Sequence, residues 1–119
     1  AEIGVATVVV GSGGQRRGSG ERFFEFAARL SFAATKFGLT VAPENLRPEE
    51  SDVGTDVRAF ADALAARRVG FTVDSYHVRQ ATPDRSWDDA LVRKPAHVHV
   101  ARGADRTMPD DDADTRAFF

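Results

Sequence analysis

Residues 71–102, FTVDSYHVRQATPDRSWDDALVRKPAHVHVAR, contain two stretches of alternating polar and apolar residues on either side of a short helical pattern. Thr82 and Pro83 predict where that helix begins, because threonine caps a helix and proline suits its first position. Pro95 ends it, because proline cannot continue a helix. The segment is therefore expected to form a strand, a short helix and a second strand.

The two expected strands are residues 71–79 and 96–102. Alternation in the second places Val98 and Val100 toward the interior and its two histidines on the opposite face. In the first, neither face is wholly apolar, which is typical of a strand near the edge of a sheet.

The first half of the chain adds further elements. Residues 3–10, IGVATVVV, are β-branched and apolar and predict a buried strand. From Glu21 the apolar residues recur with helical spacing, and Gly38 is placed to end that helix in the left-handed conformation. The expected apolar stripe of this helix consists of Phe23, Phe26, Ala27, Leu30, Ala34 and Phe37.

Residues 39–41 predict a short strand that runs into Pro43, and residues 45–52 predict an acidic surface loop. A second helical pattern occupies residues 55–69, with arginines in its last turn, where they suit the helix dipole. Without this helix the remaining order is βαββαβ.

That order predicts an α+β fold, a two-layer ferredoxin-like sandwich of four antiparallel strands and two helices, with an inserted helix between the second and third strands. Residues 1–103 are expected to form one domain, in which the insertion covers residues 45–69. Residues 104–119 hold five Asp and two Arg and predict a flexible acidic tail.

Composition restricts the possible functions. The chain has 119 residues, a formal net charge of −2 and no cysteine. It is long enough for one domain with a core. The absence of cysteine excludes disulfides, thiolate metal sites and cysteine nucleophiles. No apolar run approaches the roughly 20 residues that a membrane span needs, so no membrane association is expected.

A glycine-rich loop over residues 11–20 follows the first expected strand. Such loops bind phosphate where backbone N–H groups converge at a helix start. The Gly-Lys-Ser/Thr of a Walker A loop is missing. A flexible loop that carries Arg16 and Arg17 to a partner is the favoured interpretation.

Three histidines form a second candidate site, since His97 and His99 share a strand face and His77 lies on the other expected strand. Neutral imidazoles in this arrangement suit zinc, with Asp74 or Asp105 as a further ligand. The simpler interpretation is that they are polar residues on exposed strand faces. We therefore expect no metal and no cofactor.

Basic residues at the ends of the expected elements form a third candidate, a rim that contacts phosphates without reading bases. The rim consists of Arg16, Arg17, Arg79, Arg85, Arg93, Lys94 and Arg102.

Three segments together resemble the small-subunit ribosomal protein ten family. FAATKFGLTVAPENLRP is similar to that family's helix end, short strand and proline-bearing turn. FTVDSYHV is similar to its returning strand, and SWDDALVRKPAHVHV to its short helix and last strand. The acidic tail and the helix at residues 55–69 depart from the family pattern.

The resemblance implies a structural protein of the ribosome, not an enzyme, that contacts ribosomal RNA and neighbouring ribosomal proteins and takes no small-molecule substrate. It implies a mitochondrial location, with the cytoplasm as the alternative. His77 joins the basic rim among the implied contacts. Two other hypotheses remain open at this point. One is a small ligand-binding or phosphate-binding domain or enzyme that uses the glycine-rich loop and the histidines; the other is an interaction adaptor that uses the inserted helix.

Overall fold

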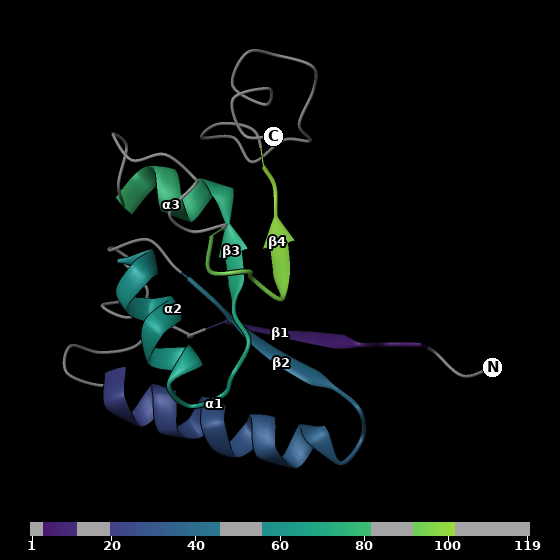
Figure 1. Ribbon diagram of the computed structural model, residues 1–119. Helices are drawn as coiled ribbons and strands as arrows, with labels where there is room; N and C mark the ends of the chain where they lie inside the picture. The colour runs from purple at the N-terminus through teal and green to yellow at the C-terminus, as the bar shows by residue number, and fades with distance from the viewer. Residues whose placement is uncertain (1–3, 12–19, 46–55, 82–91, 102–119) are drawn as a thin grey trace.

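The computed structural model describes residues 4–11, 20–45, 56–81 and 92–101. Strands and helices alternate along the chain (Figure 1). The elements are β1 (Thr7–Gly11), α1 (Gly20–Thr35), β2 (Thr40–Glu44), α2 (Val57–Ala65), β3 (Thr72–Asp74), α3 (Ser75–Ala81) and β4 (His97–His99). Among these described residues, no helix is long and apolar enough to cross a membrane.

The four strands form one curled sheet in the order β1-β2-β3-β4, and every neighbouring pair is parallel. Parallel neighbours need a crossover connection, and a helix lies between each strand and the next. The helices follow one another around one side of the twisted sheet (Figure 1).

The core lies between these helices and the sheet. Phe23 of α1 stacks on Phe60 of α2, with ring centroids 6.4 Å apart. Val98 and Val100 pack against the same cluster, which confirms their predicted inward orientation. The buried residues of the cluster are Phe23, Ala27, Phe60, Ala61, Leu64, Val69, Phe71, Val73 and Val78.

The mixture of helices and strands is as predicted, but the described residues do not form the predicted ferredoxin-like sandwich. An antiparallel sandwich needs strands that reverse direction, whereas all four strands here run the same way. The helix over residues 55–69 was predicted as an insertion and is instead α2, the crossover between β2 and β3. Treating it as dispensable produced the wrong topology.

The predicted strand over residues 71–79 is also wrong in its second half. β3 ends at Asp74, and α3 begins at Ser75. Asp74 Oδ1 accepts hydrogen bonds from the backbone N–H groups of Tyr76 (2.8 Å) and His77 (3.3 Å). An aspartate that binds the first free N–H groups starts a helix, and here this outweighs the alternating pattern.

Helix α1 is as predicted in place, and its predicted apolar stripe is confirmed in part. Phe23, Ala27 and Ala34 are buried, whereas Phe26 and Phe37 are exposed. The predicted end at Gly38 is confirmed, since Gly38 has φ 69°. Just beyond it, the Leu39 N–H donates to the Ala34 carbonyl oxygen (3.2 Å).

Other predictions fall partly or wholly outside the described residues. β1 lies within residues 3–10 except for its last residue, but it is an outer strand of the sheet and is not buried, unlike the buried central strand that was predicted. β2 extends beyond residues 39–41, and β4 lies within residues 96–102. The short helix from Thr82, most of the glycine-rich loop and the acidic tail are not among the described residues. The division at residue 103 stays a prediction.

Gly70 lies where the chain enters β3 and touches its neighbours closely. A Cβ at this position would be 3.1 Å from both the Val41 carbonyl oxygen and the Ala96 Cβ. Because strand backbone cannot yield easily, we expect Gly70→Val to lower the free energy of unfolding by about 1–3 kcal/mol. Urea denaturation measures this, with Gly11→Val as control, since nothing lies within 4 Å of a Cβ at Gly11. Equal stability of the two variants would contradict the close packing.

Candidate functional site

Polar side chains gather where three neighbouring strands end. Glu44, Asp74 and His99 are the last residues of β2, β3 and β4. Asp74 and His99 are direct partners in the register of β3 and β4. Since the strands are parallel, their carboxyl ends meet at one end of the sheet, which is where α/β enzymes place their active sites.

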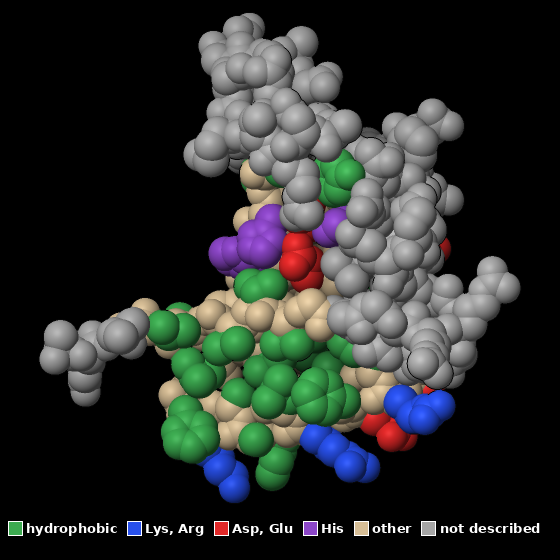
Figure 2. All heavy atoms as spheres, turned by 180° about the vertical axis from the view of Figure 1, so that it is seen from behind, with side chains coloured by type: hydrophobic (Ala, Val, Ile, Leu, Met, Phe, Trp, Pro, Cys, Tyr) green, Lys and Arg blue, Asp and Glu red, His purple; other side chains and the backbone are tan. Residues whose placement is uncertain are grey.

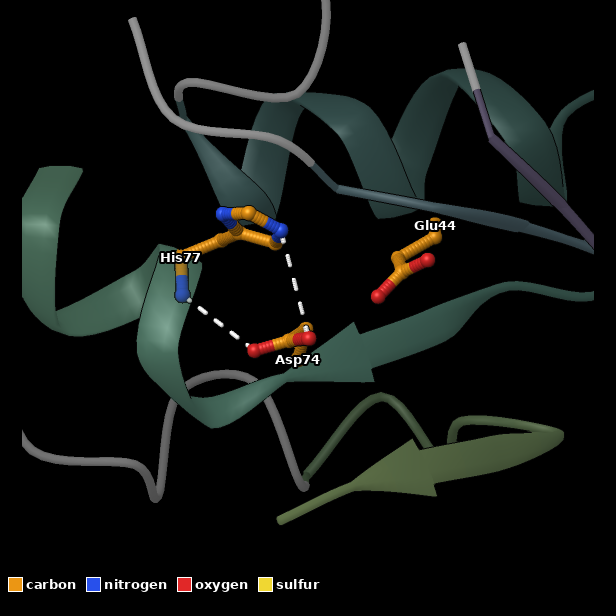
Figure 3. A group of neighbouring side chains, drawn as sticks. All are labelled: Glu44, Asp74 and His77. Atoms are coloured by element: carbon orange, nitrogen blue, oxygen red, sulfur yellow. Dashed lines mark hydrogen bonds and ion pairs between the residues drawn. The ribbon is translucent and has the colours of Figure 1, made fainter. Parts of the chain in front are cut away.

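His77 joins this cluster from the first turn of α3. Glu44, Asp74 and His77 each offer one possible ligand atom, and these atoms all lie within 4.8 Å of one another (Figure 3). His77 Nε2 is 3.9 Å from Asp74 Oδ2. Asp74 and His77 are both buried. Two carboxylates and an imidazole therefore face one another at the inner end of the site.

His99 approaches the same carboxylates from β4. Its Nδ1 is 2.8 Å from Glu44 Oε1 and 3.8 Å from Asp74 Oδ2. The His99 side chain is 39% exposed, whereas that of Asp74 is 1% exposed. The cluster is thus open to solvent on the side of His99. We call Glu44, Asp74, His77 and His99 the strand-end cluster.

Backbone hydrogen bonds fix the orientation of Asp74. Its Oδ1 accepts the two N–H groups at the start of α3, and its own N–H donates to Asn45 Oδ1 (2.9 Å). Asn45 is itself buried. Oδ1 is held in this way, and Oδ2 faces His77 and His99. Surrounding bonds of this kind keep a ligand oriented before anything binds.

Ser75 ties the end of β4 to the start of α3. Its Oγ accepts a hydrogen bond from the Ala101 N–H (2.8 Å) and donates to the Ala101 carbonyl oxygen (3.2 Å). This pair of bonds continues the β3–β4 contact beyond the last strand residue. The backbone that carries His99 is therefore held by β3 within the strand and by Ser75 just beyond it.

Burial raises the pKa of the Glu44 carboxyl above its ordinary value. The neighbouring Asp74 carboxylate acts in the same direction, whereas the bond to His99 opposes it. Two carboxyl groups side by side resist losing both protons. A divalent cation between them would relieve this repulsion.

The donor set suits such a cation. Ligand atoms about 2.0–2.2 Å from a central ion lie up to about 4.4 Å from one another. His99 Nδ1 lies 2.8 Å from Glu44 Oε1 and 3.8 Å from Asp74 Oδ2, and His77 Nε2 lies 3.9 Å from Asp74 Oδ2, so all three separations fit within this range. The ligand atoms of Glu44, Asp74 and His77, which lie within 4.8 Å of one another, need only a small side-chain movement to fit it. Two carboxylates with imidazole nitrogens favour ions such as Mn²⁺ or Zn²⁺ that accept both oxygen and nitrogen.

The three predicted histidines thus have different positions. His77 and His99 flank the same two carboxylates, whereas the exposed His97 lies against His99, with ring centroids 4.9 Å apart at 88°. Figure 2 shows histidine side chains next to acidic ones on this face of the molecule. We expected no metal because the three histidines were interpreted as polar residues on exposed strand faces. That basis does not hold for His77, which is buried.

The predicted basic rim is not tested as a binding surface. Arg93 binds both carboxylate oxygens of Asp62 in α2, at 2.7 and 3.1 Å, which lowers the pKa of that carboxyl. Lys94 is exposed. The Arg79 side chain and the whole of Arg16, Arg17, Arg85 and Arg102 lie outside what the structure describes. These contacts stay a prediction.

Sequence reasoning missed Glu44, just before the predicted surface loop, and Asn45, the first residue of that loop. The signal in the sequence was this pair of polar residues directly after an apolar run. It was overlooked because Pro43 was interpreted as the end of the strand. Asp74 and His77 carried a second signal, because residues three apart share a face only on a helix. Both signals were obscured by the strand predicted over residues 71–79.

Comparison with known structures finds one of similar fold. The chain matches the crystal structure of 3-keto-D-glucoside 4-epimerase, YcjR, from E. coli, in its apo form, with a TM-score of 0.74 and 19% sequence identity. It is similar in fold to a sugar epimerase. The match covers 98% of this chain and 51% of the epimerase chain, so this chain spans about half the length of its neighbour. No family model and no curated protein matches the sequence.

The ribosomal interpretation is therefore wrong. The described parts of the three segments that resembled the ribosomal protein ten family belong to a fold of alternating strands and helices with a parallel sheet, and 98% of this chain matches the structure of an enzyme. Ribosomal RNA and ribosomal proteins as partners, and the expectation of no enzyme and no small-molecule substrate, fall with it. The mitochondrial location, untested on its own account, loses the resemblance that implied it.

Proposed function

We propose that the chain carries the active site of an enzyme that uses a divalent cation to transfer a proton next to a carbonyl group in a sugar-like substrate. The observation that carries this proposal is the strand-end cluster, in which two carboxylates and two histidines converge at the carboxyl ends of parallel strands. The proposal takes up the hypothesis, left open by the sequence, of a small-molecule enzyme that uses the histidines. It replaces the hypothesis of a ribosomal protein.

The name of the structural neighbour supports the reaction class. A 4-epimerase of a 3-keto-D-glucoside inverts a carbon next to a ketone, where removal of a proton gives a stabilised enolate. At 19% identity the likeness extends to the fold alone, so the sugar-like substrate is part of the proposal and is tested by experiment.

Each residue of the cluster has a role in this proposal. Asp74, held by the backbone of α3, and His99 or His77 would hold the cation together with Glu44. A cation held there supplies a Lewis acid for a carbonyl oxygen. The histidine that does not hold the cation would take the proton as a general base.

Proton transfer can be measured directly. The protein is incubated in D₂O with Mn²⁺ and a 3-keto-D-glucoside or D-fructose, the cation is removed, and deuterium incorporation into the sugar is followed by mass spectrometry. We expect incorporation at the carbon next to the ketone with at least one of these probes. No incorporation from either, with the cation bound, would contradict the proposed reaction.

His97 provides a matched control for the role of His99, because both imidazoles lie on one strand and touch each other. We expect His99→Gln to lower deuterium incorporation and Mn²⁺ affinity by at least about 10–100-fold, and His97→Gln to change either by much less. Equal losses in the two variants would show that the site lies elsewhere on this face.

A further inference from the structure

The pairing of β2 with β3 decides how far apart the two carboxylates of the strand-end cluster lie, because Glu44 ends one strand and Asp74 ends the other. It is the shortest pairing in the sheet. Among the described residues, β1 is the register partner of β2 over the whole of β2, whereas β2 and β3 share the single pair of Glu44 and Thr72. The regular ladder alone therefore holds these two strand ends weakly.

Asn45 extends this pairing with its side chain. In a parallel ladder the N–H of a strand residue binds a backbone carbonyl oxygen of the neighbouring strand. The Asp74 N–H instead donates to the side-chain Oδ1 of Asn45 (2.9 Å), and the Asn45 N–H donates to the Thr72 carbonyl oxygen (3.4 Å). The residue directly after Glu44 is thus bonded to β3 at two points, one of which is the backbone of Asp74 itself.

Burial makes the Asn45 side chain hard to replace. Asn45 and Asp74 are each 1% exposed, so bulk water cannot serve as the acceptor for the Asp74 N–H. A buried donor that loses its acceptor costs the full free energy of its desolvation. The bond therefore favours one fixed arrangement of the two strand ends.

On its other side, Glu44 has much less support. Its register partner in β1 is Gly11, which has no side chain to contact it. Glu44 Oε1 lies 2.8 Å from His99 Nδ1, but the His99 side chain is 39% exposed. The position of Glu44 relative to Asp74 thus depends on β3, through the pairing that Asn45 completes.

We infer that Asn45 is a positioning residue of the cation site, which keeps Glu44 and Asp74 at the short separation that a small divalent cation needs. The ligand atoms of Glu44, Asp74 and His77 lie within 4.8 Å of one another, and ligands of one small ion lie up to about 4.4 Å apart. A wider gap between the strand ends would take one carboxylate out of reach. The inference rests on the proposed function, because it concerns the same cation.

Calorimetric titration with Mn²⁺ compares Asn45→Ala with Thr72→Val. Thr72 is the matched control, because its buried Oγ1 donates to the Ala42 carbonyl oxygen (3.0 Å) and makes another side-chain bond between the same two strands. We expect both variants to unfold at lower urea concentration than the wild type. Only Asn45→Ala should also lose Mn²⁺ affinity, by about 10–100-fold.

Bound Co²⁺ provides a second measurement, because its visible absorption spectrum depends on the geometry of its ligands. At saturating Co²⁺ we expect the spectrum of Asn45→Ala to differ from that of the wild type, and Thr72→Val to keep the wild-type spectrum. A role of Asn45 in stability alone would leave all three spectra the same and would overturn the inference.

The Mn²⁺ titration separates the inference from the proposed function. Wild-type affinity in Asn45→Ala, or equal losses in Asn45→Ala and Thr72→Val, would overturn the inference and leave the proposed function standing. A wild type that binds no Mn²⁺ would overturn both.

Asn45→Gln replaces Asn45→Ala if circular dichroism shows that the alanine variant does not fold. The longer side chain keeps an amide that can bond the Asp74 N–H, but only from a different position. Weaker Mn²⁺ binding by Asn45→Gln then supports the inference, and wild-type affinity overturns it.

Discussion

Asp74→Asn is expected to abolish binding of Mn²⁺ or Zn²⁺ and with it the proposed proton transfer. Loss of residues that merely orient a ligand weakens metal binding by about 10–100-fold, so loss of a charged ligand should exceed this. The asparagine Oδ1 can still accept the N–H groups of Tyr76 and His77 that start α3. The substitution therefore removes the charge and keeps the fold.

Titration calorimetry and thermal unfolding with and without the cation measure this effect. A cation at 100 times its dissociation constant should stabilise the wild type by about 2.7 kcal/mol and leave Asp74→Asn unchanged. Asp62→Asn makes the same chemical change at an exposed carboxylate that binds Arg93 and should respond like the wild type. If Asp74→Asn gained the same stabilisation as the wild type, the cation would be bound outside the strand-end cluster.

Local signals in the sequence were sufficient for some of the elements. Helical spacing located α1, and Gly38 ended it at the predicted place. The alternation around His97 and His99 placed Val98 and Val100 correctly on the core side. These predictions succeeded because each depends on contacts between residues that are close in the sequence.

The direction of the strands depends on contacts between distant residues, and there the prediction failed. β2 and β3 are each too short to show by pattern alone whether they run parallel. The decisive fact was that α2 packs on the core through Phe60 and Leu64, which are fully buried. A helix with such a face belongs to the fold as a crossover and does not extend from it as an insertion.

The site was hidden for the same reason. Glu44 and Asp74 are 30 residues apart, and only parallel pairing brings β2 and β3 to end at the same edge. With antiparallel strands, the end of β3 would meet the start of its neighbour, and Asp74 would lie away from Glu44. The wrong topology thus separated the two carboxylates that the correct one brings together.

Glu44→Gln is expected to stabilise the protein in the absence of metal and to remove part of its pH dependence. Because the pKa of Glu44 is raised in the folded state, the folded protein binds more protons than the unfolded one between the ordinary and the raised pKa. The free energy of unfolding therefore falls as pH rises through that window, and the loss is complete above it. Glutamine has no charge to bury and avoids this loss.

Urea denaturation in EDTA from acid to neutral pH measures the difference. The stability gain of Glu44→Gln should be largest above the raised pKa and vanish below the ordinary one. Glu25→Gln, at an exposed position of α1, should follow the wild type throughout. With Mn²⁺ present the order should reverse, because the wild type gains binding energy that the variant lacks. A variant less stable than the wild type in EDTA at neutral pH would mean that the Glu44 carboxylate is favoured by its bond to His99 and not opposed by burial.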